Sequence, residues 1–238
     1  MIETDLNLYG LMLTLAYTSN IIFISIFSFK KKYSVFEIWL LIIFEGIGII
    51  LGGKLFTYLT NFSSNKIFDF FNLSLSSLGS VIGLLIMIFL FKFLLKKETK
   101  EVLNICLPSI PLMYSIGKMG CFLVGCCFGI EYQGIGNIVY NYSQIAPIGI
   151  NLFPIQLIES ISFFIIFIYI FTRSIKNEYN YKQMGIIILV CATTKFILDF
   201  FRMSHVGKIL SINQILCLIF VFIGIGILYI NKKKNIIL

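Results

Sequence analysis

Charged residues are scarce in this chain: Asp, Glu, Lys and Arg together make up 13% of its 238 residues, whereas apolar residues make up 58%. The mean hydropathy of +0.96 lies well above the range of soluble globular domains. This shortage of charge excludes a soluble enzyme and predicts an integral membrane protein.

Histidine and proline are also rare, with one His and four Pro in the whole chain. No Pro/Ser-rich stretch marks a linker, so we expect a single domain over residues 1–238. Cys121, Cys126 and Cys127 lie close together, but their spacing is not a pair of C-x₂-C knuckles, and His205 is far away in sequence. We therefore expect no metal and no cofactor.

Long apolar runs dominate what is present. A spanning helix needs about 20 mostly apolar residues, and seven runs approach or exceed this length. They are Leu8–Phe29, Val35–Thr60, Leu73–Phe93, Val102–Leu123, Leu152–Phe171, Met184–Phe201 and Leu210–Ile230. The sequence thus predicts an all-α, polytopic membrane protein with about seven transmembrane helices. The segment "MIETDLN" before the first run lacks Lys and Arg, so we expect a retained helix and not a cleaved signal peptide.

Basic residues gather at alternate connections between these runs. They are Lys30–Lys32, then Lys92, Lys96, Lys97 and Lys100, then Arg173, Lys176 and Lys182, and finally Lys232–Lys234. The longest connection, Cys127–Asn151, has no Lys or Arg, although Arg202 and Lys208 are a partial exception elsewhere. The positive-inside rule places the N-terminus outside and the C-terminus in the cytoplasm. The net charge of +8 then reflects contact with anionic membrane lipids, and nucleic-acid binding is not expected.

Charged residues also occur within or directly after the apolar runs, where each costs roughly 2.5–3.5 kcal/mol near the bilayer centre. They are Glu45, Lys54, Lys118, Glu159, Lys195, Asp199 and Arg202. In "KFILDFFR", spacings of four and three place Lys195, Asp199 and Arg202 on one helical face. One interpretation is a structural lock between helices. The other starts from the excess of cations over acids and predicts an anionic ligand such as a phosphate head group.

Seven segments, in order, resemble the bacterial prolipoprotein diacylglyceryl transferases. They are "YGLMLTLAY", "GIILGGKLFTY", "LSSLGSVIG", "GKMGCFLVGCCFG", "FPIQLIE", "KFILDFFR" and "LSINQIL". The resemblance implies a multi-pass enzyme of the bacterial plasma (inner) membrane. Such an enzyme transfers the diacylglyceryl group of phosphatidylglycerol to the thiol of a lipobox cysteine in a prolipoprotein signal peptide, releasing glycerol phosphate.

The resemblance also implies site residues. Tyr9 matches a functional tyrosine, Lys118 stands for the arginine of G-R-x-G-N-F, Lys195 and Arg202 stand for arginines, and Asp199 stands for a glutamate. The predicted catalytic residues are Lys118, Lys195, Asp199, Tyr9 and Cys126. The predicted phospholipid-binding residues are Lys118, Lys54, Cys121, Gly125, Gly129, Gln156, Glu159 and Arg202.

Three positions depart from the family pattern. Cys121 stands where the signature has asparagine, Cys126 where it has glutamate, and Leu78 where an H-G-G segment has histidine. These departures leave two alternatives open: a related phospholipid-dependent transferase with a different acceptor, and a non-catalytic lipid-binding paralogue. The cysteines are either inert packing, or one of Cys126 and Cys127 is a thiolate that itself accepts an acyl or diacylglyceryl group.

Overall fold

The computed structural model describes residues 2–3, 6–60, 75–175 and 181–237. Its helices are α1 (Leu6–Lys30), α2 (Val35–Thr60), α3 (Ser77–Leu95), α4 (Thr99–Cys106), α5 (Ser109–Val124), α6 (Ile155–Ile175), α7 (Tyr181–Asp199), the 3₁₀ turn η2 (Met203–His205) and α8 (Ile212–Ile237); the strands are β1 (Ile2–Glu3) and β2 (Tyr140–Tyr142). Within the described residues, seven helical segments are long and apolar enough to cross a membrane, with α4 and α5 counted as one. The predicted seven-span, all-α membrane fold is confirmed.

Some predicted boundaries were wrong. The fourth run is not one helix, because α4 ends at Cys106 and α5 begins at Ser109. Pro108 lies in this break and has no N–H to continue the helical hydrogen bonds. The third run was predicted from Leu73, which lies outside the described residues, and α3 begins after Ser76, whose hydroxyl accepts from Gly79 N at 3.4 Å.

The chain divides into two compact units. One contains Met1–Asn20 and Pro111–Leu238, and the other contains Ile21–Ile110. Lys54 lies in the second unit, whereas every other predicted site residue lies in the first. The expected single domain stays a prediction.

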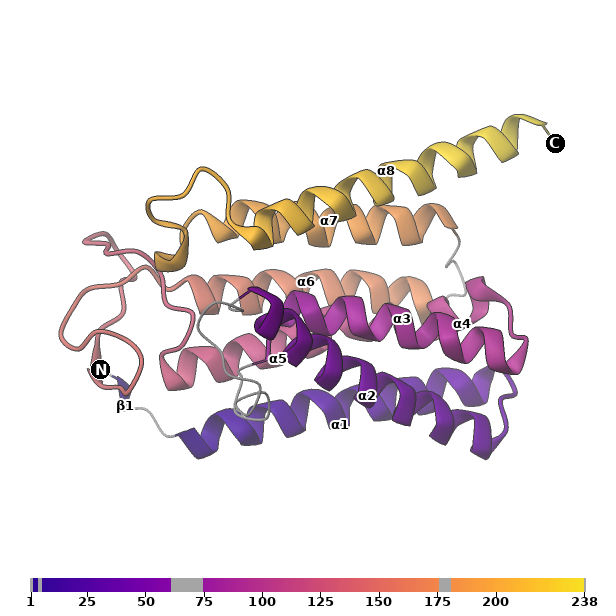
Figure 1. Cartoon of the computed structure of the whole chain (residues 1–238), viewed down its shortest axis with the longest axis horizontal. Helices are drawn as coiled ribbons and strands as arrows, with labels where there is room; N and C mark the ends of the chain where they lie inside the picture. The colour runs from indigo at the N-terminus through magenta and orange to yellow at the C-terminus, as the bar shows by residue number, and fades with distance from the viewer. Residues whose placement is uncertain (1, 4–5, 61–74, 176–180, 238) are drawn as a thin grey trace. The chain divides into compact units, whose positions relative to one another are not determined.

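In the unit Ile21–Ile110, α2 and α3 pack side by side (Figure 1). Glycines spaced by four face one another at this contact: Gly48 and Gly52 on α2, Gly79 and Gly83 on α3. A Cβ atom added at Gly52 would lie 2.5 Å from the carbonyl oxygen of Gly79. Small residues at such spacing let helix backbones approach closely in lipid, where helices gain no hydrophobic energy from meeting.

Replacing one of these glycines is expected to separate the two helices. Gly83→Ala places a methyl group against the backbone of Gly48 and Gly52, and overpacking of this kind costs about 1–3 kcal/mol. Thermal unfolding in detergent should show a lowered midpoint. Gly226→Ala on α8 is the matched control, since a Cβ there meets nothing within 4 Å. An equal midpoint for both variants would contradict the proposed packing.

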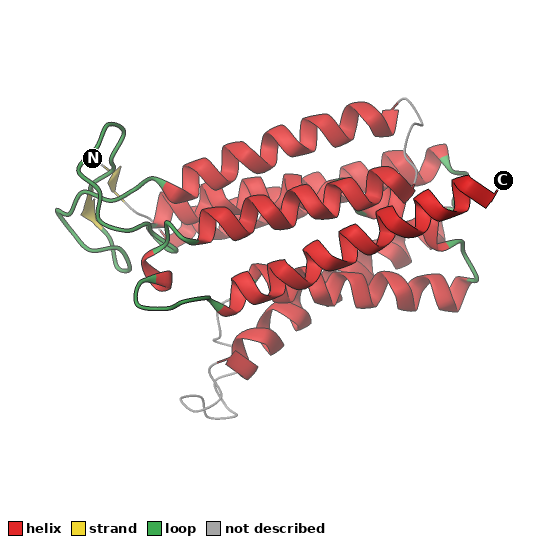
Figure 2. Cartoon of the chain, turned by 90° about the horizontal axis from the view of Figure 1, so that it is seen from above, coloured by secondary structure: helices red, strands yellow, loops and turns green. Residues whose placement is uncertain are grey.

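In the other unit, α7 and α8 run side by side (Figures 1 and 2). A Cβ atom added at Gly185 would lie 3.2 Å from the carbonyl oxygen of Gly224, so this pair also packs closely. Helices α5 and α6 are joined by reciprocal bonds, in which Ser115 Oγ donates to Ser160 O at 2.8 Å and Ser160 Oγ donates to Ser115 O at 2.9 Å. Polar groups thus hold α5 to α6 within an otherwise apolar segment.

The loop from Gly125 to Pro154 joins α5 to α6 at one end of this unit (Figure 2). Tyr140, Ala146 and Leu152 form a small buried core within it. Tyr140 OH donates to Phe122 O at 2.8 Å, which ties the loop to the last turns of α5. β1 pairs in parallel with β2 of the loop. The loop is therefore folded, and it fixes the chain on both sides of the predicted site.

Candidate functional site

The Glu159 carboxylate, one turn into α6, is the centre of an ion-pair cluster and is fully buried. Oε1 accepts from Lys195 Nζ at 2.8 Å and from Tyr114 OH at 3.2 Å. Oε2 accepts from Arg202 Nη2 at 2.5 Å and lies 3.3 Å from Lys118 Nζ. One carboxylate therefore contacts all three of the cations predicted for this unit's site.

Asp199, the last residue of α7, supplies a second buried carboxylate. Its Oδ1 lies 3.1 Å from Lys195 Nζ and 3.6 Å from Arg202 Nε. Its Oδ2 accepts from Ser211 Oγ at 2.5 Å. The predicted meeting of Lys195, Asp199 and Arg202 is thus confirmed.

The prediction that Arg202 shares a helical face with Lys195 and Asp199 was wrong. Helix α7 ends at Asp199, and Arg202 is extended, with φ −92° and ψ 141°. Arg202 forms an antiparallel bridge with Gly129, next to which Ile130 N donates to Phe201 O at 3.0 Å and Met203 N to Phe128 O at 3.2 Å. Pairing with the loop, and not helical periodicity, turns the guanidinium toward the carboxylates.

The cluster holds more positive than negative charge. Three cations, Lys118, Lys195 and Arg202, face two carboxylates. All five residues are buried, with at most 6% of their surface exposed. Burial would lower the pKa of Arg202, but the charge of Glu159 outweighs this effect and raises it. With all five groups ionised, the three cations and two carboxylates carry a net charge of +1.

Glu159→Gln removes the carboxylate that separates the three cations, and we expect it to destabilise the protein strongly. Breaking one partner of a buried ion pair costs about 3–5 kcal/mol. The double variant Glu159→Gln with Lys195→Met restores the net charge and should recover part of the loss. Thermal unfolding in detergent measures both, and an unchanged midpoint for Glu159→Gln would refute the central role of this carboxylate.

Tyr9 and Gln156 also lie at this end of the unit. The ring of Tyr9 packs against Gly120, since a Cβ atom added there would lie 3.3 Å from Tyr9 Cδ2. Gln156 is fully buried, and its Nε2 donates to the carbonyl of Cys126 at 3.0 Å. The bond ties α6 to the end of α5, whereas the buried Oε1 of Gln156 has no hydrogen-bond partner among the described residues. Head-group binding by Gln156 stays a prediction.

The predicted glycines have structural roles. Gly125 has φ +79° and ends α5 in the left-handed conformation that favours glycine. At Gly129 an added Cβ would collide with the carbonyl oxygen of Phe153, so glycine is needed there for close backbone approach. Contact of either glycine with a phospholipid stays a prediction.

Lys54 and Leu78 lie on α2 and α3 in the other unit. A role for Lys54 in lipid binding stays a prediction. His205 lies in the same unit as the cluster, buried with its ring against Phe200 at a centroid distance of 4.8 Å. No ion pair or hydrogen bond that the described residues form within the cluster includes His205.

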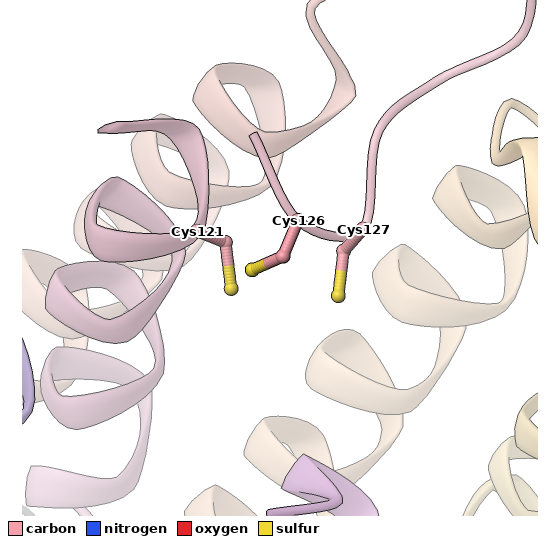
Figure 3. A group of neighbouring side chains, drawn as sticks. All are labelled: Cys121, Cys126 and Cys127. Carbon is pink, nitrogen blue, oxygen red and sulfur yellow. The ribbon is translucent and has the colours of Figure 1, made fainter. Parts of the chain in front are cut away.

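The side chains of Cys121, Cys126 and Cys127 converge (Figure 3), and the charges of Lys118 and Arg202 act on Cys127. Cys121 is on the last turns of α5 and is buried, Cys126 is half-buried and Cys127 is exposed. Hydrogen bonds from the other two thiols, together with the charge of Lys118, lower the pKa of Cys127. Hydrogen bonds with Cys121 and Cys127 raise the pKa of Cys126. A nucleophilic role for Cys126 stays a prediction.

Sequence reasoning missed Tyr114 and Ser211 as members of the cluster. Tyr114 precedes Lys118 by four residues and so shares its helix face, which was a usable signal. Ser211 and Gln214 form a capping box at the start of α8, in which Gln214 N donates to Ser211 Oγ at 3.1 Å and Ser211 N to Gln214 Oε1 at 2.9 Å. The S-x-x-Q pattern predicts the helix cap, but it does not predict the contact of Ser211 with Asp199.

The fold and the cluster define a class: a multi-pass membrane protein that buries a net positive ionic cluster at one end of its helices. The chain belongs to the prolipoprotein diacylglyceryl transferase family, which matches residues 1–230. It is similar to a phosphatidylglycerol–prolipoprotein diacylglyceryl transferase of Clostridium tetani (strain Massachusetts / E88), at 27% identity over 95% of this chain and 94% of that protein. It is also similar to phosphatidylglycerol–prolipoprotein diacylglyceryl transferase 2 of Clostridium perfringens (strain 13 / Type A), at 30% identity over 78% of this chain and 75% of that protein.

Proposed function

We propose that this protein transfers the diacylglyceryl group of phosphatidylglycerol to the thiol of a lipobox cysteine in a prolipoprotein. Its membership of the family is the observation that carries the proposal. The buried cluster of Lys118, Lys195, Arg202, Glu159 and Asp199 supports it, because the chemistry needs a site for an anionic phosphate.

A phospholipid phosphate suits the charge of this cluster. A surplus buried cation is costly unless an anion accompanies it, and a phosphodiester supplies one negative charge. Arg202 Nε has no hydrogen-bond partner among the described residues, so one guanidinium donor is available to such an anion. Lysine contributes as a point charge, while arginine offers a planar fork suited to phosphate oxygens.

The proposed reaction is a displacement at the glyceryl carbon. The thiol sulfur forms a bond to this carbon as the bond from carbon to phosphate oxygen breaks, and the released glycerol phosphate formally takes up the thiol proton. Negative charge develops on the departing oxygen, so fixed cations beside it lower the barrier. Lys118 and Arg202 have this role in the proposal, and Glu159 and Asp199 position them.

The orientation of the chain supports a reaction at the outer face of the bacterial inner membrane. The cluster lies where α5 and α7 end and α6 and α8 begin. Arg173 in the last turn of α6, Lys182 at the start of α7 and Lys232 near the end of α8 lie at the opposite ends of these helices. The positive-inside rule assigns those ends to the cytoplasm. A signal peptide emerging from the membrane would meet the site at the outer face, with membrane lipids around it.

The test is direct: purified protein in detergent is incubated with phosphatidylglycerol labelled in its glycerol head group and a lipobox peptide. Release of labelled glycerol phosphate together with a lipidated peptide is expected. Release without modification of the peptide would instead indicate another acceptor, and tight lipid binding without turnover would indicate a non-catalytic lipid-binding protein. Either of these results would overturn the proposal.

Lys118→Met should reduce turnover in this assay by about 100-fold, as expected for loss of one group that stabilises the leaving oxyanion. Lys118→Arg should retain most of the activity, because the charge is kept. Lys208→Met is the matched control, since Lys208 is exposed and its Nζ donates only to Ser204 O at 2.8 Å in its own turn. Equal activity of the Lys118→Met and Lys208→Met variants would remove Lys118 from the proposed machinery.

A further inference from the structure

The three thiols beside the ionic cluster come from one short segment. Cys121 lies four residues before α5 gives way to Gly125, and Cys126 and Cys127 follow directly. The chain turns back because Gly125 N and Cys126 N both donate to Cys121 O, at 2.9 and 3.1 Å. This helix-ending turn returns Cys126 to the level of Cys121. All three Sγ atoms lie within 4.8 Å of one another (Figure 3).

The backbone at Cys127 supports a role beyond packing. Cys127 has φ +56°, one of three non-glycine residues with positive φ in the described chain. The left-handed conformation is unfavourable for a residue with a side chain. Strain of this kind persists where the surrounding structure or a function requires it, and here it accompanies a sulfur placed beside two others.

We propose that Cys121, Cys126 and Cys127 bind a zinc ion, whose fourth coordination position takes the acceptor thiol. Three sulfur ligands favour a soft or borderline metal, and zinc is commonly bound by thiolates at about 2.3 Å. A regular zinc site therefore needs sulfur atoms about 3.8–4.0 Å apart. The widest pair of sulfur atoms, at up to 4.8 Å, must therefore close by up to about 1 Å when the ion binds.

Charge selects zinc over monovalent copper. A zinc ion with three thiolates carries one net negative charge, and the cluster of Lys118, Lys195, Arg202, Glu159 and Asp199 carries one net positive charge. Before a phospholipid or an acceptor thiol binds, these two charges offset each other. Copper(I) with three thiolates would carry two negative charges and leave the region unbalanced. Lys118 and Arg202 are electrostatic neighbours of Cys127, so this balance is local.

The fourth position gives the site its chemistry. Among the described residues, three cysteine ligands lie together here. A tetrahedral zinc ion bound by them has one coordination position left for water or substrate. A zinc-bound thiol loses its proton to water and stays bound as thiolate. This sulfur then bonds to the glyceryl carbon as the phosphate oxygen leaves. The neutral thioether binds zinc weakly, so water displaces it. The identity of this acceptor rests on the proposed function; the zinc site does not.

Metal content tests the site without any assay of activity. Full-length protein, loaded with zinc in detergent and freed of unbound metal, should retain about one zinc per chain. Cys126→Ser and Cys127→Ser should each lower zinc affinity by at least about 100-fold, because even outer-shell changes cost about 10–100-fold. Cys191→Ala on α7 is the matched cysteine control, and this variant should retain as much zinc as the parent protein. A parent that retains no more zinc than Cys126→Ser overturns the site.

Cobalt substitution tests the fourth position in the unaltered protein, so folding of a variant is not at issue. A lipobox peptide with cysteine should change the visible spectrum of bound Co²⁺, and the same peptide with serine should not. No difference between the two peptides overturns the thiol role. A cysteine-dependent change without release of glycerol phosphate would overturn the proposed transfer and keep the site. Equal release by parent and zinc-depleted protein would overturn the role of zinc and keep the transfer.

Discussion

The buried carboxylate of Glu159 is the constraint on which this end of the protein depends. It faces cations from α5, from α7 and from the turn after α7, so it ties three segments of the chain to α6. Each ion taken from water costs several kcal/mol, and only close opposite charge offsets that cost. Without the Glu159 carboxylate between them, the positive charges of Lys118, Lys195 and Arg202 would repel one another. The position of α6 therefore determines whether the other three segments meet at all.

Close backbone contact supplies the other part of the architecture. In lipid, apolar side chains gain little by meeting one another, so small residues and polar bonds decide which helices touch. Glycines serve this purpose between α2 and α3, and Gly185 and Gly224 do so between α7 and α8. Ser115 and Ser160 hold α5 to α6 by two mutual hydrogen bonds. These contacts position the helices within each unit. In the unit that contains α6, α7 and α8, the ionic cluster lies at the end where the loop from Gly125 to Pro154 is folded.

The helical spans were predictable because length and hydropathy alone identify them. The contact between Lys195 and Asp199 was predictable too, since both lie on one helix four residues apart. Arg202 was placed in the right group for the wrong reason, because its direction comes from pairing with Gly129, 73 positions earlier in the chain. Ser211 and Tyr114 join the cluster through contacts between different segments. A single sequence carries no direct signal for the contact of Ser211 with Asp199, whereas the four-residue spacing from Tyr114 to Lys118 indicates that Tyr114 shares the helix face of Lys118.

The cysteines show that spacing along the sequence does not predict which thiols meet where a helix ends. Their order does not resemble zinc knuckles, yet the turn at Gly125 brings all three sulfur atoms together. In the family resemblance, Cys126 replaces a glutamate and so removes one negative charge from the segment in which Cys127 lies near Lys118 and Arg202. A zinc ion held by three thiolates would restore that single charge. It would also supply a means of ionising a thiol in a chain that has leucine, at Leu78, in place of the family histidine. Under the proposed zinc site the two departures would have one common physical explanation, because a metal that binds and acidifies thiols would compensate for both a lost acid and a lost base.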